Sequence, residues 1–546
     1  MAVQQELKIT GMTCNHCAVT VEKALRGVKG VREASVSFPE GTALVISENE
    51  FPIQFLLEAV QKAGYGASVS PTTEPSATPI QSVPLHLAII GSGSAAFACA
   101  IRAVEGGARV TMIEAGTLGG TCVNVGCVPS KILIRQAQMA QDQRAHPFPG
   151  LRHYEPIIDR KALVKQQQER VLALREAKYA HVLTSHPDIS FVAGYARFAD
   201  THTLLVETND GTRQTIQADR FLIAVGARPQ VPAIAGLAET PYWTSTEALV
   251  AEELPRHLLV LGGSVVALEL AQAFRRLGSE VTILARSTLL SKEDPALGQG
   301  LLTALENEGI QVRTHTVPRS VHYGEGVFTL ECGSETIHGD RLLVATGRIA
   351  NTQDLGLAEI GVETLPNGAI PVNERMQSNV PHIYAAGDCT SLPQFVYVAA
   401  AGGTRAAVNL LGGNARLDLS VMPAVVFTDP QVATVGLDEQ QARKQGLDVE
   451  SRTLGLDNVP RALANFNTQG FIKLVAEKGS GKLVGAQILA AEGGEIVQAA
   501  ALALRGGLTI QDLADQLFPY LTMVEGLKLC AQTFTKDVSQ LSCCAG

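Results

Sequence analysis

The chain contains the same supersecondary unit twice, and this repeat constrains its fold more than any other feature. In each copy an apolar strand leads into a glycine-rich turn, a helix and a second strand that closes on a charged residue. The first copy runs from Leu85 to Glu114 and the second from His257 to Arg286. Such units build parallel sheets covered by helices and bind dinucleotides at the turn. The repeat therefore predicts two Rossmann-like domains in a multidomain α/β chain.

The first turn has the residues that a dinucleotide site needs. Gly91, Gly93 and Ala96 follow an apolar strand and open a helix. Glycine lets the backbone approach a pyrophosphate, and the helix N-terminus meets its negative charge. Glu114 closes the second strand, where a carboxylate accepts a hydrogen bond from a ribose hydroxyl. We interpret this turn as the site of flavin adenine dinucleotide (FAD).

The second turn is less regular and ends in the opposite charge. Gly262, Ser264 and Ala267 occupy the turn, with serine at the middle glycine position. Arg286 stands where the first copy has its acid, and a cation there pairs with a 2′-phosphate. This indicates NADPH, although an ordinary surface arginine is the alternative. Asp388, after the apolar segment Ile383-Tyr-Ala-Ala-Gly, is expected to bind the ribityl chain of the flavin.

A pair of cysteines follows the first unit directly, in Gly-Gly-Thr-Cys122-Val-Asn-Val-Gly-Cys127-Val-Pro-Ser-Lys131. On an ideal helix, residues five apart are separated by a rise of about 7.5 Å, beyond the usual Cα separation of a disulfide. We therefore expect a bend at Val125-Gly126. Pro129 then suits the first turn of the next helix.

These motifs resemble those of the pyridine nucleotide–disulfide oxidoreductases over residues 85–546. The resemblance implies a redox pair in which Cys127 lies next to the flavin and Cys122 is the outward interchange thiol. It also implies that Lys131 and Glu269 pair near the flavin, where a lysine stabilises both a thiolate and a reduced flavin. The matching motifs place further cofactor contacts at Gly120, Thr121, Lys131, Gly226 and Gly347.

One position departs from the disulfide reductases of this family. Members that reduce glutathione or lipoamide have a His-Pro-Thr-x-x-Glu signature, and Tyr520 takes the histidine position here. A phenol with a pKa near ~10 is a poor proton shuttle at neutral pH. Disulfide substrates are therefore disfavoured.

Residues 5–68 are expected to form a small βαββαβ domain of ferredoxin-like fold. Cys14-Asn-His-Cys17 lies in its first loop and helix start. Such a pair could be a redox pair or half of a zinc site, but no second ligand pair lies within the domain. The stretch Gly-Met-Thr-Cys-Asn-His-Cys resembles the heavy-metal-associated domain, in which two thiolates hold one soft ion. The signature does not separate Hg(II) from Cu(I).

A third cysteine pair, Cys543-Cys544, lies near the end of the chain. Together with the other two pairs it resembles the mercuric reductase family. This implies a homodimer in which the terminal pair of one subunit reaches the active site of the other, near Tyr179 and Tyr520. Hg(II)–thiol complexes would be the substrate, passed from the terminal pair to the redox pair and reduced to Hg(0) with electrons from NADPH through FAD. Without the resemblance, Tyr179 reads as an ordinary tyrosine of an amphipathic helix.

Charge and composition limit the partners and the compartment. The 44 basic and 53 acidic residues leave a net charge of −9 without a basic run, so nucleic acid is a poor candidate. The first ten residues carry an acid and no signal-peptide core, which favours a cytoplasmic protein. The sequence neither indicates nor excludes a peripheral contact with a mercury transporter.

The expected domains follow from these motifs and from changes in composition. They are a heavy-metal-associated domain (1–69), a flexible linker (70–84), a FAD domain in two parts (85–232 and 351–421), an NADPH domain (233–350) and a C-terminal α+β dimerisation domain with the cysteine tail (422–546). Two rival functions remain. One is a disulfide reductase of the dihydrolipoamide dehydrogenase type, and the other is a non-enzymatic soft-metal chaperone.

Overall fold

The computed structural model describes residues 3–12, 15–47, 52–69 and 84–540. The chain divides into two compact units, Met1–Val83 and Pro84–Gly546, and each is described by itself. The expected linker, up to residue 83, lies outside the described residues. So do Cys14 and the terminal pair Cys543-Cys544.

The N-terminal unit has the expected βαββαβ order. Its antiparallel sheet has the strand order β2-β3-β1-β4, and side chains such as Leu7 and Leu25 form a closed core under the two helices. The elements are β1 (Val3–Thr10), α1 (Asn15–Arg26), β2 (Val31–Ser37), β3 (Thr42–Ser47), α2 (Ile53–Lys62) and β4 (Gly66–Val69).

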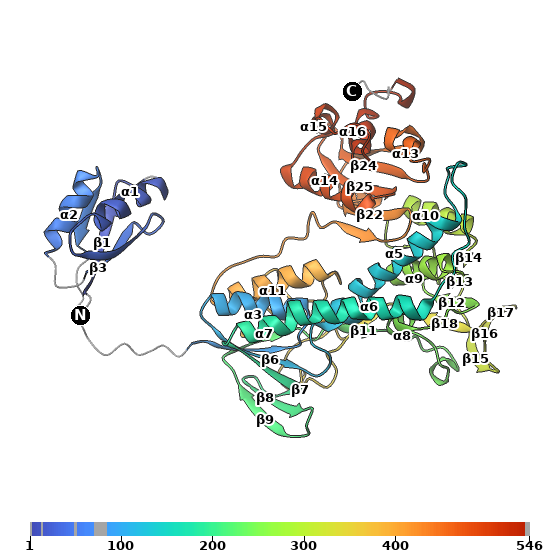
Figure 1. Cartoon of the computed structure of the whole chain (residues 1–546), viewed down its shortest axis with the longest axis horizontal. Coiled ribbons are helices and arrows are strands. Elements are labelled where there is room, and N and C mark those ends of the chain that lie inside the picture. The colour runs from blue at the N-terminus through green and yellow to red at the C-terminus, as the bar shows by residue number, and fades with distance from the viewer. Residues whose placement is uncertain (1–2, 13–14, 48–51, 70–83, 541–546) are drawn as a thin grey trace. The chain divides into compact units, whose positions relative to one another are not determined.

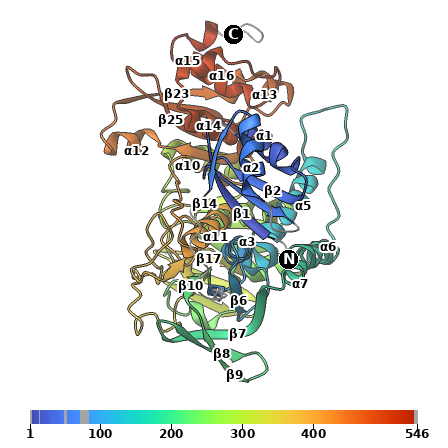
Figure 2. The same cartoon turned by 90° about the vertical axis from the view of Figure 1, so that its left-hand side faces the viewer.

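The first Rossmann-like sheet of the second unit is built from distant parts of the chain. Its strand order is β20-β10-β5-β6-β7-β8-β9, parallel from β20 to β7 and antiparallel beyond. Strands β8 and β9 extend away from the C-terminal elements in both views (Figures 1 and 2). The strands are β5 (His86–Ile90), β6 (Arg109–Glu114), β7 (Ile189–Asp200), β8 (Thr203–Thr208), β9 (Arg213–Gln217), β10 (Arg220–Ile223) and β20 (Ile383–Ala385).

Helices α3 and α11 pack closely against each other beside this sheet. A glycine permits the contact, because a Cβ on Gly403 would lie 2.1 Å from the carbonyl oxygen of Ala95. The helices of this part are α3 (Ser94–Glu105), α4 (Gly120–Val125), α5 (Cys127–Arg144), α6 (Arg160–Arg175), a π-helical turn (Glu176–Ala180), α7 (His181–Ser185) and α11 (Val396–Leu410).

The second repeat forms a parallel four-stranded sheet in the order β14-β13-β12-β18. A three-stranded antiparallel sheet, β15-β16-β17, and the strand pair β11–β19 accompany it. The elements are β11 (Ala227–Pro229), a 3-10 turn (Leu237–Glu239), α8 (Ser245–Val250), β12 (His257–Leu261), α9 (Val265–Arg276), β13 (Glu280–Leu284), α10 (Pro295–Asn307), β14 (Gln311–Arg313), β15 (Ser320–Gly324), β16 (Val327–Cys332), β17 (Glu335–Gly339), β18 (Arg341–Val344) and β19 (Arg348–Ala350).

The C-terminal elements form a separate α+β layer pair, drawn in orange and red (Figure 1). The antiparallel sheet has the order β21-β22-β25-β24-β23, and its core residues also contact α14 and α16. The elements are β21 (Ala424–Val426), β22 (Gln431–Gly436), α12 (Glu439–Lys444), β23 (Val449–Gly455), a 3-10 turn (Leu456–Asn458), α13 (Pro460–Ala464), β24 (Phe471–Glu477), β25 (Leu483–Ala490), α14 (Gly493–Gly506), α15 (Ile510–Asp515), α16 (Glu525–Gln532) and a 3-10 turn (Val538–Gln540).

Among the described residues, no helix combines the length and apolar character that crossing a membrane requires.

Candidate functional site

One cavity of about 1470 Å³ is lined by eleven of the predicted site residues. Both cysteines of the redox motif line it, together with the first nucleotide turn and the N-terminal residues Val265 and Val266 of α9. Its wall includes these predicted residues: Gly91, Gly93, Glu114, Gly120, Thr121, Cys122, Cys127, Lys131, Gly226, Glu269 and Asp388. The second unit therefore brings two distant sequence motifs to one space.

The expected bend in the cysteine motif occurs at Gly126. The backbone there (φ −129°, ψ −117°) ends α4 and starts α5. A Cβ on Gly126 would lie 2.9 Å from the carbonyl oxygen of Thr121, so the bend leaves no room for a side chain. Pro129 lies buried in the first turn of α5, as predicted. Because the helix breaks, Cys122 and Cys127 can interact although they sit on different helices.

Cys122 and Cys127 are both free thiols in the structure. A hydrogen bond from the Cys122 thiol, assisted by the charge of Lys131, lowers the pKa of Cys127 to about 7 against the opposing effect of burial. The same hydrogen bond and burial raise the pKa of Cys122. Near neutral pH the pair therefore holds one thiolate on Cys127 and one proton on Cys122.

Lys131 and Glu269 form the predicted pair. The Nζ of Lys131 donates to Oε2 of Glu269 at 2.6 Å. The Glu269 side chain is only 5% exposed, whereas that of Lys131 is 34% exposed and reaches the cavity. A buried carboxylate needs such a partner, because desolvation without one costs several kcal/mol. Lys131 lies one helical turn after Cys127 on α5, so its charge stands beside the redox pair.

The first nucleotide turn has the geometry that FAD requires. Gly91 has φ +111°, and a Cβ there would lie 2.3 Å from the carbonyl oxygen of Ala224. A Cβ on Gly93 would meet no protein atom within 4 Å, so the space before α3 is open. No side chain caps α3, whose N-terminus is therefore free to meet a phosphate. These residues fit the pyrophosphate of a dinucleotide.

Carboxylates stand at two further points of the cavity wall. Glu114 accepts hydrogen bonds at 2.6 Å from the Ser92 hydroxyl and from the backbone N–H of Gly116. Asp388 lies 3.6 Å from Nε of Arg348; burial raises its pKa and Arg348 opposes that rise. The sequence predicted contacts with hydroxyl groups of a bound dinucleotide at both positions, and both carboxylates line the cavity.

The second turn repeats the first in its backbone contacts. The N–H of Gly262 donates to the carbonyl of Leu284 at 2.9 Å, as the N–H of Gly91 does to Ile113 at 2.7 Å. A Cβ on Gly262 would lie 2.3 Å from the carbonyl oxygen of Ala345. Ser264 precedes α9 without a side-chain capping bond, so this helix N-terminus is also free to bind phosphate.

Several predicted residues lie outside the lining of the cavity. Ala96 in α3 and Ala267 in α9 are fully buried, and Arg286 is exposed just after β13. Gly347 has φ +131° in the turn between β18 and β19. Gly262 and Ser264 lie in the second nucleotide turn, before α9.

The two tyrosines predicted for the active site have different positions. Tyr179 packs edge-on against Phe97 at 5.0 Å between ring centroids. Burial raises its pKa, and negative charge on the nearby cysteine pair, Cys122 and Cys127, acts in the same direction. Tyr520 is 50% exposed in the segment before α16 and does not line the cavity of its own chain. The structure therefore brings Tyr179, but not Tyr520, to the cysteines of the same chain.

Sequence reasoning missed Phe427. Its ring lies 4.4 Å from the Lys131 ammonium, and its backbone N–H donates to Oε1 of Glu269 at 2.9 Å. Phe427 also lines the cavity. No motif marks it, because it is 158 residues from Glu269 and follows an ordinary apolar strand.

Comparison with known proteins places these features in one family. The model of the pyridine nucleotide-disulphide oxidoreductases matches residues 85–403, that of their dimerisation domain residues 422–531, and that of the heavy-metal-associated domain residues 6–66. Among solved structures, the HOCl-induced flavoprotein disulfide reductase RclA from Escherichia coli matches with a TM-score of 0.74 and 30% identity, over 83% of this chain and 100% of that chain.

Full-length relatives narrow the family further. A mercuric reductase of Acidithiobacillus ferrooxidans is 59% identical over 99% of both chains. A mercuric reductase of Shigella flexneri is 57% identical over 99% of this chain and 100% of its own. The chain therefore belongs to the mercuric reductases, within the FAD- and NAD(P)H-dependent pyridine nucleotide-disulphide oxidoreductases.

Proposed function

We propose that this chain reduces Hg(II) to elemental mercury with electrons from NADPH, and that Cys122 and Cys127 hold the metal ion during reduction. The observation that carries the proposal is the thiol pair in the wall of a cavity that the first nucleotide turn and Val265 and Val266, at the start of α9, also line. Bound FAD supplies a two-electron carrier between the nicotinamide and this pair.

The dithiol suits the substrate. Hg(II) is a soft ion that prefers thiolate ligands. Cys127 supplies a thiolate near neutral pH, and Cys122 loses its proton when the metal ion takes the place of that proton. Two electrons convert Hg(II) to Hg(0), and the thiolates are released because the neutral atom no longer binds them.

Lys131 and Glu269 serve this chemistry as a pair. The ammonium stabilises negative charge on the thiols and would stabilise it on a reduced flavin, while Glu269 holds the ammonium in place. The Gly91/Gly93 turn and Glu114 would hold the adenosine diphosphate part of FAD, with Asp388 on its ribityl chain. The Gly262 turn with Arg286 would hold NADPH.

Delivery of the substrate completes the proposal. In a homodimer, Cys543 and Cys544 of one subunit take Hg(II) from a thiol complex and pass it by ligand exchange to Cys122 and Cys127 of the other. Tyr520 enters the same site with the tail. The dimerisation-domain match at residues 422–531 supports this arrangement. Exchange is fast where one thiolate attacks before another leaves, so paired sites can move a tightly bound ion.

The test is NADPH oxidation by the purified holoenzyme with Hg(II) in excess thiol, with oxidised glutathione and lipoamide as competing substrates. We expect turnover with Hg(II), release of volatile mercury, and little turnover of either disulfide. Turnover of a disulfide without turnover of Hg(II) would instead favour the disulfide-reductase alternative.

A further inference from the structure

The Lys131 ammonium has a second neighbour besides Glu269. The ring of Phe427 lies 4.4 Å from Nζ, within the range of a cation–π contact. A lysine side chain is long and flexible, and this one is 34% exposed, so a single ion pair leaves it considerable freedom. The ring supplies a face that favours one position of the ammonium.

Phe427 is itself attached to Glu269. Its backbone N–H donates to Oε1 of Glu269 at 2.9 Å, while Oε2 accepts from Lys131 at 2.6 Å. Both oxygens of this buried carboxylate are therefore occupied, one by the lysine and one by the backbone of the residue whose ring touches that lysine. The three residues form a closed set of contacts drawn from α5, α9 and the segment after β21.

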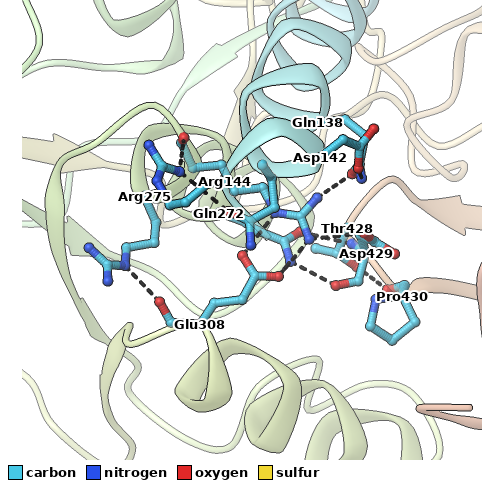
Figure 3. Close-up of polar contacts among 11 residues, drawn as sticks. Gln138, Asp142, Arg144, Gln272, Arg275, Glu308, Thr428, Asp429 and Pro430 are labelled. Atoms are coloured by element: carbon cyan, nitrogen blue, oxygen red, sulfur yellow. Dashed lines mark hydrogen bonds and ion pairs between the residues drawn. The ribbon is translucent and has the colours of Figure 1, made fainter. Parts of the chain in front are cut away.

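The segment after Phe427 is hydrogen-bonded to the turns of α9 that follow Glu269. Oε1 of Gln272 accepts from the N–H of Asp429 at 2.8 Å, and Nε2 of Gln272 donates to the Asp429 carbonyl at 2.8 Å. Nη2 of Arg276 donates to the Asp429 carboxylate at 2.9 Å and to that of Glu308 at 2.6 Å. Figure 3 shows Gln272, Glu308 and Asp429 joined in this network.

The spacing of the α9 residues explains the arrangement. Glu269, Gln272 and Arg276 are separated by three and four positions, so they line one face of the helix. We call the contacts of Gln272 and Arg276 with Asp429 the α9 clamp. Gln272 and Arg276 are 4% and 6% exposed, which protects these polar contacts from water.

We propose that Phe427 is a positioning residue for the reaction: its ring holds the Lys131 ammonium beside the redox cysteines, and the α9 clamp holds the ring in place. The inference rests on the proposed function, in which Lys131 serves the dithiol. It adds a residue from the start of the C-terminal domain to the reduction site of the same chain.

The first experiment is a double-mutant cycle with Phe427→Leu and Lys131→Met, measured as kcat and KM for Hg(II) reduction by the purified holoenzymes. We expect Phe427→Leu to lower kcat about three- to thirty-fold, the range of a cation–π contact, with a much smaller change in KM. In the Lys131→Met background the same substitution should have no further effect. Phe427→Tyr keeps the ring and should retain activity.

The second experiment tests the clamp. Gln272→Leu removes both backbone bonds to Asp429 and should lower kcat in the same direction as Phe427→Leu. Arg275→Met is the matched control, because Arg275 bonds to the carbonyls of Glu308 and Ser279 and not to Asp429. The rate of cysteine alkylation in the reduced holoenzymes, at one fixed pH, gives a readout independent of turnover. It should fall in Phe427→Leu and Gln272→Leu but not in Phe427→Tyr or Arg275→Met.

The outcomes separate this inference from the proposed function. An undiminished kcat in Phe427→Leu, or an equal loss in both Lys131 backgrounds, would overturn the inference while Hg(II) reduction by the wild type stands. Equal losses in Phe427→Leu and Phe427→Tyr would also overturn it. Absence of Hg(II) reduction in the wild type would remove the proposed function itself.

Discussion

Lys131 and Glu269 are 138 residues apart in the chain, yet Nζ of the lysine lies 2.6 Å from Oε2 of the glutamate. The pair joins α5, which carries Cys127, to α9, which opens at the second nucleotide turn. The charge beside the redox cysteines therefore depends on how two Rossmann-like domains pack against each other.

The two members of this pair should shift the reactivity of Cys127 in opposite directions. Cys127 has a pKa of about 7: the hydrogen bond from Cys122 and the charge of Lys131 lower this pKa, and burial and the charge of Glu269 raise it. As the pH falls through that value the thiolate gains a proton and alkylation slows. Lys131→Met should move the midpoint up, and Glu269→Gln should move it down. The measurement is the rate of iodoacetamide labelling of the reduced protein against pH, with Cys127 identified by mass spectrometry. Shifts in the same direction would contradict this account.

The terminal cysteines should matter for one step only. Replacing Cys543 and Cys544 by alanine should strongly impair turnover of thiol-chelated Hg(II), because the ligand-exchange path loses its entry point. Flavin reduction by NADPH, followed by stopped-flow absorbance, should keep its wild-type rate. Loss of both activities together would show that the tail has another role.

Gly93→Ala should weaken FAD binding without disturbing the protein. A Cβ at this position meets no protein atom within 4 Å, so the methyl group enters only the space where a pyrophosphate would lie. The dissociation constant of FAD for the apoprotein, from fluorescence titration, should rise at least tenfold, whereas the melting temperature of the apoprotein should not change. Gly150→Ala, which also adds a methyl group in open space, is the control and should bind FAD normally.

Arg286 should set the choice between NADPH and NADH. A charge-assisted hydrogen bond contributes about 1.5–3 kcal/mol, so Arg286→Ala should raise KM for NADPH by roughly ten- to a hundred-fold. KM for NADH, which lacks the 2′-phosphate, should change little. Steady-state kinetics with both nucleotides provide the measurement, and an equal effect on both would assign Arg286 to another task.

Glu293 should destabilise the folded protein at neutral pH. Burial and the neighbouring Asp438 raise its pKa above the ordinary 4.5. The unfolded chain therefore ionises first, and stability falls as the pH rises from that value through the folded pKa. Glu293→Gln removes this loss. The variant should melt at a higher temperature than the wild type at pH 7, and the difference should shrink as the pH is lowered toward about 5. A difference that grows on acidification would reverse the sign of the argument.

Local patterns were enough to predict most of the fold. Strand β12 begins at His257, where the second copy of the repeat was predicted to begin, and the bend at Gly126 followed from the helical rise between two cysteines. These features depend on residues close in sequence, whose periodicity and backbone preferences act before any tertiary contact forms. The βαββαβ order of the N-terminal unit was predictable for the same reason.

Local sequence patterns predicted less about the residues that surround the redox cysteines. The pairing of Lys131 with Glu269 was expected only from the family resemblance, and Phe427 was not expected at all. Tyr520 was expected at the active site, but it does not line the cavity of its own chain. Contacts of this kind depend on how separate domains pack, which leaves no periodic signal in the sequence.

The sequence by itself determined the two nucleotide turns, the three cysteine pairs and the missing histidine, because each depends on residue type at fixed local spacing. Only the tertiary structure decided which side chains share the cavity with Cys122 and Cys127. In the folded chain the ring of Phe427 lies against Lys131, which is one helical turn from Cys127. Phe427 is 300 positions beyond Cys127 in the sequence. The physical reason is that a cation's position is set by the faces packed around it, and those faces come together only when the domains fold against each other.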